Sequence, residues 1–316
     1  MRETETGRPR VSVVYVAYRT PSALLNTSLS SVSVAAERAD VDLEVLVADN
    51  GGLDREAISS AAKVIGDGKN LGFGEAVNAS VAQAEGDFVL LMNPDSTLDA
   101  DALSLLLAEA GVQAGPQLFN SLLLNGDRAQ IHAYNLWWTS TSLFLKKRKF
   151  ARTLEGWRDA ARPVQVPRLC GAGLFGRRDV LVKLGPFDES FFLYGEDVDL
   201  SLRAKRAGVG LTLVPKSIIR HDAGGSSEGS SGLVQAARTD AHLRLLARHQ
   251  PYALSLLGRL EHTAVTLLGV LTKVRQPKHA ADRARRLREV ARWGFHRDRR
   301  RFDPTAHSDH SGARAA

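Results

Sequence analysis

The chain has little of several features that define whole classes of protein. It has 316 residues and a single cysteine, Cys170, so no disulfide bond can form within it. The polar start MRETETGRPR lacks a charged and then apolar leader, so we expect an intracellular protein. The apolar segment Tyr252–Val274 has no uncharged run longer than ten residues, whereas a membrane-spanning helix needs roughly twenty. These absences argue against a disulfide-stabilised fold and against a membrane-spanning protein.

The composition is that of a globular protein with an uneven distribution of charge. Hydrophobic residues make up 44% of the chain and charged residues 24%, and the length is ample for a full core. The formal net charge is +7, but residues 241–316 hold 16 Lys and Arg against 6 Asp and Glu, which is +10 and leaves −3 for residues 1–240. A basic C-terminal part is typical of contact with nucleic acid or with an anionic membrane.

Hydrophobic patterning predicts alternating strands and helices in the first part of the chain. The expected strands are Val11–Tyr18, Leu43–Asn50, residues 62–68 and Asp87–Ser96, with helices between them. This alternation predicts an α/β fold with a mostly parallel sheet. Residues 113–167 are predicted to be irregular, and a strand over residues 209–215 is expected to precede a loop that contains His221.

The C-terminal part is predicted to be helical, so we expect a catalytic domain over residues 1–232 and a helical extension over residues 233–316. The segment Leu233–His249 has apolar residues at helical spacing, and Tyr252–Val274 is apolar over most of its circumference. An Arg-rich helix with interspersed apolar residues follows. Two interpretations stay open: the helices lie in a membrane interface, or they pack on the catalytic domain with one solvated end.

Carboxylates follow two of the predicted strands. Asp49 ends the second strand, and Asn93-Pro94-Asp95 ends the fourth. Ligands of open parallel sheets bind at the carboxyl ends of the strands, and Mg²⁺ often takes one or two carboxylates beside a phosphate. The alternative is an ordinary turn, since Asn, Pro and Asp are all turn residues.

Two glycines, Gly72 and Gly74, open a predicted helix and could bring backbone N–H groups near a phosphate. The segment does not follow the pattern Gly-x-Gly-x-x-Gly, which makes a nicotinamide site a poor interpretation. His221 precedes the polar loop Gly224–Ser227, which could close over a ligand. A lone histidine is otherwise more often structural.

The stretch FDESFFLYGEDVDLSLRAKRAG, Phe187–Gly208, places three acids, Glu196, Asp197 and Asp199, beside aromatic residues. One of these carboxylates can cap the helix that follows. Capping does not account for all three, and a buried carboxylate can also accept a proton from a substrate hydroxyl. The stretch is therefore the strongest candidate for catalysis.

These motifs, taken in order, resemble those of a family-2 glycosyltransferase of GT-A fold. The motifs are AYR, VADNGG, NLGFGEAVN, LLMNPDS, GAGLFGRR, the stretch quoted above and H-x-x-G-x-S, and they cover roughly Val11 to Ser227. The nearest likeness is to bacterial rhamnosyltransferases of cell-wall or O-antigen polysaccharide synthesis. The resemblance implies a nucleotide-sugar donor, a divalent cation (Mg²⁺ or Mn²⁺) and an inverting displacement.

The resemblance also implies roles for individual residues. Asp197 would be the general base, supported by Glu196, and Asp95 and His221 would hold the metal ion. The nucleotide sugar would contact Ala17, Tyr18, Arg19, Asp49, Gly72, Asn78, Asn93 and Asp95. The acceptor side would be shaped by Phe191, Phe192 and Tyr194.

The leading expectation for the donor is dTDP-L-rhamnose, with galactofuranosyl, mannosyl or glucosyl donors as the alternative. We expect a glycan or polyprenyl-linked acceptor and peripheral contact with an anionic membrane at its inner face. The competing hypotheses are a non-catalytic interaction protein with the same fold, and nucleic-acid binding through the Arg-rich part, for which no recognised motif is present.

Overall fold

The computed structural model describes residues 7–130, 134, 140–221, 232–272, 277–298 and 301–304. The elements in chain order are β1 Arg10–Ala17, α1 Ser22–Ala39, β2 Asp42–Asp49, β3 Ala62–Ile65, α2 Phe73–Gln83, β4 Phe88–Met92, β5 Ser96–Leu98, α3 Ala102–Val112, β6 Gln117–Asn125, β7 Arg128–Ala129, α4 Ser140–Arg158, β8 Val164–Gln165, β9 Leu174–Arg177, α5 Arg178–Leu184, α6 Glu196–Arg206, β10 Gly210–His221, α7 Gly232–His249, α8 Tyr252–Thr272 and α9 Pro277–Trp293.

The chain divides into two compact units. The sheet unit comprises residues 1–136, 149–188 and 197–228, and the helical unit comprises residues 137–148, 189–196 and 229–316. The division is discontinuous in sequence, because a short segment before α6 belongs to the helical unit. The boundary between a catalytic domain and a helical extension at residue 232 stays a prediction.

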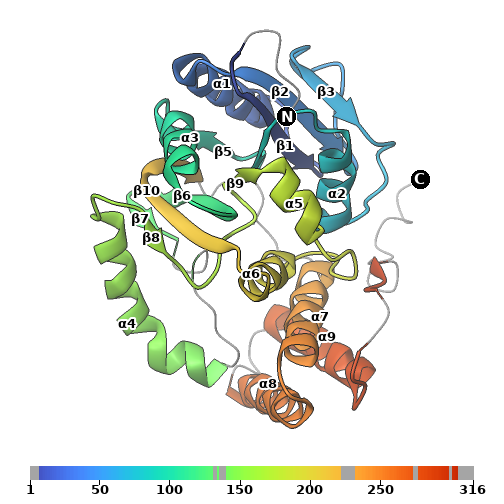
Figure 1. The fold of residues 1–316 in the computed structure, drawn as a ribbon. Helices are drawn as coiled ribbons and strands as arrows, with labels where there is room; N and C mark the ends of the chain where they lie inside the picture. Colours follow the sequence, from blue (N-terminus) through green and yellow to red (C-terminus); the bar gives the residue numbers. More distant parts are fainter. Residues whose placement is uncertain are drawn as a thin grey trace, which may run out of the picture. The chain divides into compact units, whose positions relative to one another are not determined.

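One ten-stranded sheet forms the centre of the sheet unit (Figure 1). Its main strand order is β3-β2-β1-β4-β9-β6-β10-β5, with β7 beside β6 and β8 beside β10. Strands β3, β2, β1 and β4 pair in parallel, as do β6 and β10, while β9 runs antiparallel between β4 and β6. The expected α/β fold with a mostly parallel sheet is confirmed.

Helices cover both faces of this sheet, and alternate residues of each strand serve the two faces. Val13 and Tyr15 of β1 pack in one apolar cluster with α1 and α3, whereas Val14 packs in a second cluster with α2, α5 and α6. Both clusters consist of buried side chains. A central strand that is buried on both faces reads as a continuous apolar run, which explains the sequence VSVVYVA.

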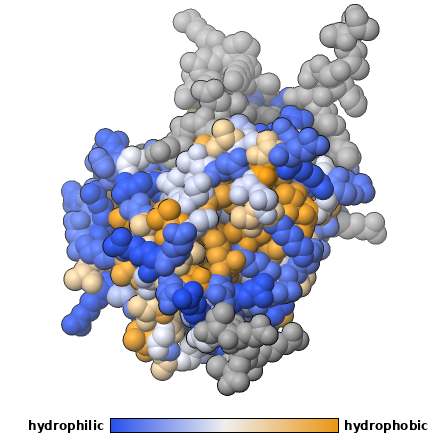
Figure 2. All heavy atoms as spheres, turned by 90° about the horizontal axis from the view of Figure 1, so that it is seen from above, coloured by the Kyte–Doolittle hydropathy of each residue, from blue (hydrophilic) through white to orange (hydrophobic). Residues whose placement is uncertain are grey.

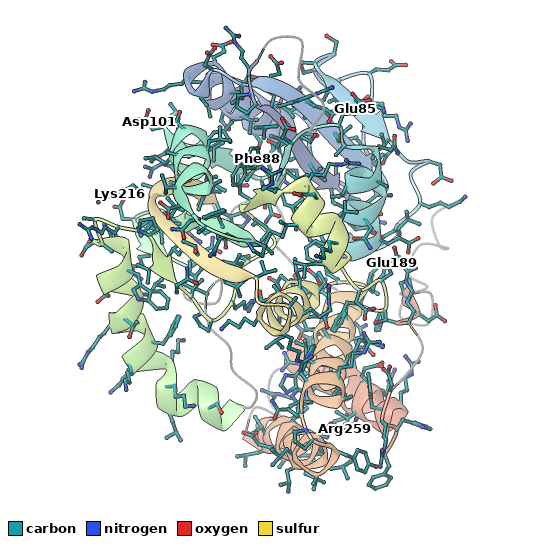
Figure 3. The ribbon with its side chains drawn as sticks, viewed as in Figure 1. Glu85, Phe88, Asp101, Glu189, Lys216 and Arg259 are labelled. Carbon is teal, nitrogen blue, oxygen red and sulfur yellow. The ribbon has the colours of Figure 1, made fainter. Side chains whose placement is uncertain are left out.

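Aromatic packing ties β9 into the middle of the sheet. Phe88 at the start of β4 stacks on Phe175 of β9 with ring centroids 5.2 Å apart, and Figure 3 labels Phe88 in this position. Phe119 of β6 contacts the other side of Phe175 at 6.3 Å. Aromatic pairs at these separations are favourable beyond the area that they bury. The antiparallel strand is therefore held by side chains as well as by backbone hydrogen bonds.

Two sequence-based predictions for this unit are wrong. Residues 113–167 are not irregular, because they contain the nine-residue strand β6 and the 19-residue helix α4. The strand predicted over residues 209–215 continues as β10 to His221, so His221 ends a strand rather than lying in a loop. The register of β10 against β6 shifts between Val214 and Ile218, and this bulge carries the strand past Pro215.

The helical unit contains α7, α8 and α9, which pack against one another. Its centre is polar as well as apolar: Asp240 accepts hydrogen bonds from the buried Arg244 at 3.1 Å and from Trp293 Nε1 at 2.8 Å. Burial raises the pKa of Asp240, while the Arg244 cation and the Trp293 hydrogen bond oppose that rise. In the described residues, no helix is long and apolar enough to cross a membrane.

Seen from the side of α1 and β3, the surface of the molecule has apolar side chains gathered in the middle and hydrophilic ones around them (Figure 2). Val34 on α1 is one of the large apolar side chains that stay exposed, at 52%.

Candidate active site

The site begins where β1 and β2 end. The two strands pair in parallel with Ala17 opposite Asp49, and the Asn50 N–H donates to the Ala17 carbonyl at 2.8 Å. Because parallel strands point the same way, their last residues and the following turns share one edge of the sheet. Polar groups that follow these strands therefore gather where ligands of such sheets bind.

Asp49 is a buried carboxylate that is already engaged by a cation. Its Oδ1 accepts the Gly51 N–H at 3.0 Å, and its Oδ2 accepts Arg55 Nε at 2.8 Å and Nη2 at 2.7 Å. The Arg55 guanidinium also donates to the Gly66 carbonyl at 2.8 Å. This pair fixes the turn after β2, and Arg55 was not among the residues predicted from sequence. The predicted contact of Asp49 with a base or ribose stays a prediction.

Tyr18 and Arg19 lie exposed beside this turn. Arg19 has a φ of 50°, and its N–H donates to the Gly51 carbonyl at 2.7 Å. Its guanidinium lies 5.3 Å from the centre of the Tyr18 ring. Gly51 has a φ of 120°, and a Cβ there would come within 3.1 Å of the Gly68 carbonyl, so the turn requires glycine at this position. Contact of Tyr18 and Arg19 with a nucleotide stays a prediction.

Asn50 organises the glycine turn that opens α2. Its Oδ1 accepts the Leu71 N–H at 2.8 Å, and its Nδ2 donates to Asn70 Oδ1 at 3.1 Å. Asn70 Oδ1 in turn accepts the Gly72 N–H at 3.1 Å. Gly72 has a φ of 84° and precedes the first residue of α2. The predicted turn therefore exists, and Asn50 is the residue that sequence reasoning missed in it.

Asn78 on α2 holds a distant segment of the chain. Its Nδ2 donates to the Phe187 carbonyl at 2.8 Å, and its Oδ1 accepts the Phe187 N–H at 3.0 Å. Both ends of the amide are thus used on one backbone unit. These two hydrogen bonds fasten the segment after α5 to α2. A contact of Asn78 with a nucleotide stays a prediction.

Asp95 and His221 are brought together by strand pairing. β5 and β10 pair antiparallel with Ser96 opposite His221, which places Asp95 beside the end of β10. His221 Nε2 lies 3.0 Å from Asp95 Oδ1, and the Asp95 side chain is buried. Asn93 closes the turn, since its carbonyl accepts both the N–H and the hydroxyl of Ser96, at 3.2 and 2.8 Å. Residues 126 positions apart in the chain therefore form one pair.

The Asp95–His221 pair could hold a divalent cation only together with donor atoms from a bound substrate and water. An imidazole nitrogen and a carboxylate oxygen are a donor set that suits Mn²⁺ better than Mg²⁺, which prefers oxygen. Among the described residues, no group of three or more His, Cys, Asp and Glu is placed to hold a metal ion. A cation at Asp95 and His221 would complete its coordination with water and with the oxygens of a diphosphate.

Asp197 lies in the first turn of α6, buried to 8% exposure. Its Oδ2 accepts Arg168 Nη2 at 2.7 Å and the Gly171 N–H at 3.3 Å, and its Oδ1 accepts the Val198 N–H at 2.7 Å. The bond to its own helix is ordinary for an acid at a helix start. The other two fix the carboxylate from a different segment, so its position is determined from both sides.

The segment that reaches Asp197, residues 168–173, also contacts β4, β6 and the start of α2. Asn120 of β6 straps it: Asn120 Oδ1 accepts the Cys170 N–H at 2.9 Å, and Nδ2 donates to the Ala172 carbonyl at 3.0 Å. The Gly173 N–H donates to the Leu91 carbonyl of β4 at 2.7 Å. A Cβ on Gly171 would lie 3.2 Å from the Phe73 ring of α2 and 3.9 Å from Asp197 Cβ. We call residues 168–173 the strap segment.

Asp199 has a structural role that the sequence left open. Its Oδ2 accepts Arg203 Nε at 2.7 Å on the same helix. Arg203 also donates to three carbonyls at the C-terminal end of α5, those of Leu184, Gly185 and Pro186. Arginine satisfies the last carbonyls of a helix well because it is a multiple donor. Asp199 therefore belongs to the joint between α5 and α6, while Glu196 is buried as the first residue of α6.

The three aromatic residues before α6 belong to the helical unit and differ in exposure. Phe191 is buried, with the guanidinium groups of Arg244 and Arg248 at 5.8 and 5.6 Å from its ring centre. Phe192 is also buried and stacks on Phe302 at 5.6 Å. Tyr194 is 38% exposed, and Arg238 lies 4.6 Å from its ring centre. The predicted acceptor-side role of Phe191, Phe192 and Tyr194 stays a prediction, and Tyr194 is the most exposed of the three.

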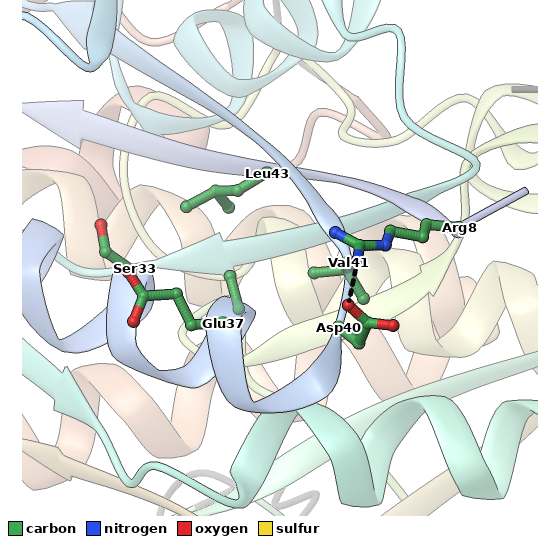
Figure 4. A pocket seen from close by; sticks show the side chains of 7 residues that line it. Arg8, Ser33, Glu37, Asp40, Val41 and Leu43 are labelled. Carbon is green, nitrogen blue, oxygen red and sulfur yellow. Dashed lines mark ion pairs between the residues drawn. The ribbon is translucent and has the colours of Figure 1, made fainter. Parts of the chain in front are cut away.

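A separate pocket of about 420 Å³ lies at the opposite edge of the sheet. It is lined by Arg8, Ser33, Ala36, Glu37, Asp40, Val41 and Leu43 (Figure 4). Its Arg8–Asp40 ion pair, 3.0 Å long, is exposed. β1 and β2 begin at Arg10 and Asp42, so this pocket lies at the amino ends of the strands and not at the edge of Asp49 and Asp95. The predicted loop Gly224–Ser227 lies outside the described residues.

The mostly parallel sheet, with Asp49 and Asp95 at the carboxyl ends of its strands, is that of a GT-A glycosyltransferase fold. Comparison with known proteins supports this assignment. The chain is similar to the solved mannosyltransferase PcManGT from Pyrobaculum calidifontis in complex with GDP-Man and Mn²⁺, with a TM-score of 0.52 and 16% identity over 91% of this chain and 87% of that one. At this identity the similarity shows the fold.

The family model described as "Glycosyltransferase like family 2" matches residues 9–239. The chain therefore belongs to this family and is a glycosyltransferase, as predicted. It is 28% identical over 275 residues to the N-acetylglucosaminyl-diphospho-decaprenol L-rhamnosyltransferase of Mycobacterium tuberculosis, covering 75% of this chain and 84% of the relative. It is 29% identical over 160 residues to rhamnosyltransferase WbbL of Escherichia coli K12, covering 46% of this chain and 58% of that one.

Proposed function

We propose that the protein transfers L-rhamnose from dTDP-L-rhamnose to a hydroxyl of a lipid-linked or polysaccharide acceptor in cell-envelope glycan synthesis. The observation that carries the proposal is the Asp95–His221 pair, 3.0 Å apart at the carboxyl edge of the sheet. A two-ligand cation site that needs a diphosphate suits a nucleotide-sugar donor. Rhamnose rests on the names of the two relatives, and galactofuranose, mannose or glucose is the alternative sugar.

The proposed reaction inverts the anomeric centre in one displacement. The acceptor oxygen forms a bond to the anomeric carbon, the bond from that carbon to the diphosphate breaks, and the nucleoside diphosphate leaves with the electron pair. The acceptor proton passes to Asp197, which acts as general base. A cation held by Asp95 and His221 would neutralise the negative charge that develops on the diphosphate.

The hydrogen bonds of Asp197 determine which of its oxygens can act as the base. Its Oδ2 accepts hydrogen bonds from Arg168 and Gly171, whereas its Oδ1 accepts one from the Val198 N–H. A carboxylate oxygen can accept two hydrogen bonds, so Oδ1 can receive the acceptor hydroxyl without release of Arg168. Arg168 then acts as a positioning residue that holds Oδ2.

We further propose that the enzyme works in the cytoplasm at the inner face of the membrane. The support is the decaprenol-linked substrate in the name of the M. tuberculosis relative, together with the net charge of +10 over residues 241–316. A cationic surface is attracted to anionic lipids.

The first test is a thermal-shift panel of nucleotide sugars with and without Mn²⁺, because a ligand that binds the folded state raises the melting temperature. A shift with a dTDP-sugar that Mn²⁺ enhances supports the proposal. A shift with UDP- or GDP-sugars alone keeps the reaction class and rejects rhamnose. If the folded protein shows no shift with any nucleotide, the non-catalytic hypothesis replaces the transferase.

A further inference from the structure

Helix α8 exposes an apolar face. Its large side chains Leu254, Leu257, Leu260, Val265, Leu267 and Leu268 are between 46% and 64% exposed. Leu254, Leu257 and Leu260 recur at intervals of three, so they lie on one side of the helix. We call these six residues the outer α8 face. Large contiguous apolar areas are uncommon on the surfaces of soluble monomers and mark interaction sites.

The buried side of α8 is polar. Ser255, Arg259 and Thr266 are between 0% and 5% exposed. The Arg259 guanidinium, on the helix as labelled in Figure 3, donates to the Gly294 carbonyl at 2.9 Å and lies 5.1 Å from the centre of the Trp293 ring. These contacts anchor α8 to the end of α9 with its polar side inward. A surface helix normally has the opposite orientation, so the outer α8 face requires a partner.

An aromatic and cationic cluster lies at the start of α8. The Tyr252 hydroxyl donates to the Phe295 carbonyl at 2.8 Å, and the Arg297 guanidinium lies 4.8 Å from the centre of the Tyr252 ring. The Phe295 side chain is 80% exposed. Aromatic rings with a polar end and arginines with an apolar stem favour the headgroup level of a bilayer.

Net charge distinguishes between two partners for the outer α8 face, a second copy of the chain and an anionic bilayer. The part of the chain that carries α8 and α9, residues 241–316, has a net charge of +10. A second copy docked there would bring another C-terminal part of the same sign near it, which is unfavourable, whereas an anionic bilayer is complementary to this part of the chain. The charged residues Arg259 and Glu261 interrupt the apolar sequence of α8, and no helix among the described residues is long and apolar enough to cross a membrane. An orientation of α8 in the plane of the bilayer agrees with both observations.

We propose that the outer α8 face, with Tyr252, Phe295 and Arg297 at its start, docks in the plane of an anionic bilayer at the boundary of headgroups and acyl chains. The face buries leucine side chains there, and the cations contact lipid phosphates. The inference rests on the proposed function only in that a lipid-linked acceptor gives the enzyme a reason to bind membrane.

The test uses the full chain and vesicles of phosphatidylglycerol in phosphatidylcholine, with co-sedimentation as the readout. The test variant is Leu254→Gln, Leu257→Gln and Leu260→Gln, since glutamine keeps the helix propensity. The matched control is Val34→Gln, Val112→Gln and Leu145→Gln, which removes three exposed apolar residues elsewhere, at 52%, 76% and 70% exposure.

We expect the wild type and the control to bind these vesicles. The test variant should bind at least about tenfold more weakly, because it lacks three leucine side chains that the bilayer would bury. Binding of the wild type should also weaken on neutral vesicles and at high salt. Equal binding of the test variant, or no binding of the wild type, overturns the proposal. A wild-type dimer that the test variant dissociates, without vesicle binding, assigns the face to a second copy instead.

A separate measurement keeps this proposal distinct from the transferase proposal. The nucleotide-sugar thermal shift of the test variant should equal that of the wild type, since α8 is not part of the sheet unit. Vesicle binding without any nucleotide shift in the wild type would leave the docking face and remove the proposed function. A nucleotide shift without vesicle binding would do the reverse.

Discussion

The substitution Asp197→Asn separates the proposed base from the structural role of the same side chain. The carboxylate receives three donors: Arg168 Nη2 at 2.7 Å, the Gly171 N–H at 3.3 Å and the Val198 N–H at 2.7 Å. Asparagine has the same shape but one acceptor oxygen, and its NH₂ group is itself a donor. In either orientation of the amide, the asparagine NH₂ group faces an N–H donor that the carboxylate had accepted.

The structural cost and the catalytic cost have different sizes. Loss of a hydrogen bond to a charged group lowers the free energy of unfolding by about 1.5–3 kcal/mol. Removal of a general base lowers the turnover number by about 10²–10⁴-fold, which corresponds to about 3–5 kcal/mol of activation free energy. A protein that stays folded at the assay temperature should therefore lose at least about a hundredfold in turnover while it still binds the donor.

Asp199→Asn is the matched control. Asp199 is also buried two residues further along α6, and it accepts a hydrogen bond from Arg203 at 2.7 Å. This variant should lose stability to a similar extent and keep its turnover.

The assay measures release of nucleoside diphosphate with a saturating acceptor, beside donor binding by thermal shift and unfolding by denaturant. Turnover of Asp197→Asn within a few-fold of the wild type would refute the assignment of the base. Equal loss of turnover in both variants would show that the joint of α6, and not the proton acceptor, had been disturbed.

Three further predictions concern other parts of the chain. Asp95→Ala should abolish the enhancement of donor binding by Mn²⁺ in the thermal shift while leaving the metal-free shift unchanged; an equal loss in chelator would rule out a metal ligand. Arg203→Leu should lower the free energy of unfolding by about 3–5 kcal/mol in urea titration, because it removes the Arg203 cation that pairs with the buried Asp199 carboxylate. Burial and the neighbouring His262 lower the pKa of His242 from 6.5 to about 4, so its stabilising contribution is present above pH 6.5 and is lost as the pH falls toward 4. The wild type should therefore lose about 2 kcal/mol from this group by about pH 5, and His242→Phe should lose that much less; the same pH dependence in both proteins would contradict it.

The alternating strands and helices of the first part were predictable because their patterns are local. Strand β6 was missed because QLFNSLLLN carries polar residues in its middle. Those residues look like a turn, but each serves a distant partner in the fold: Asn120 holds the strap segment, and the Ser121 hydroxyl hydrogen-bonds to that of Ser217 at 2.7 Å. A polar residue that is satisfied by tertiary contacts cannot be told from a turn residue in a single sequence.

The candidate site was predictable as a set of residue types but not as a set of contacts. Asp95 and His221 were both identified, yet only the pairing of β5 with β10 shows that they touch. Arg55 and Arg168 were missed, because an arginine that pairs with a carboxylate has no sequence pattern when its partner lies in another element. The only local signal near Arg168 was the run of small residues Gly171, Ala172 and Gly173, which indicates close backbone approach.

The strap segment connects several elements of the candidate site. Gly171 contacts the start of α2 through Phe73 and the base candidate through its N–H to Asp197. Gly173 is bonded to β4 just before the turn that carries Asp95. Since Asn120 fixes the segment from the buried strand β6, the start of α2, the end of β4 and the base candidate all contact one piece of backbone. Precise placement of reacting groups is a large part of catalysis, and a substitution in this segment would disturb all three together.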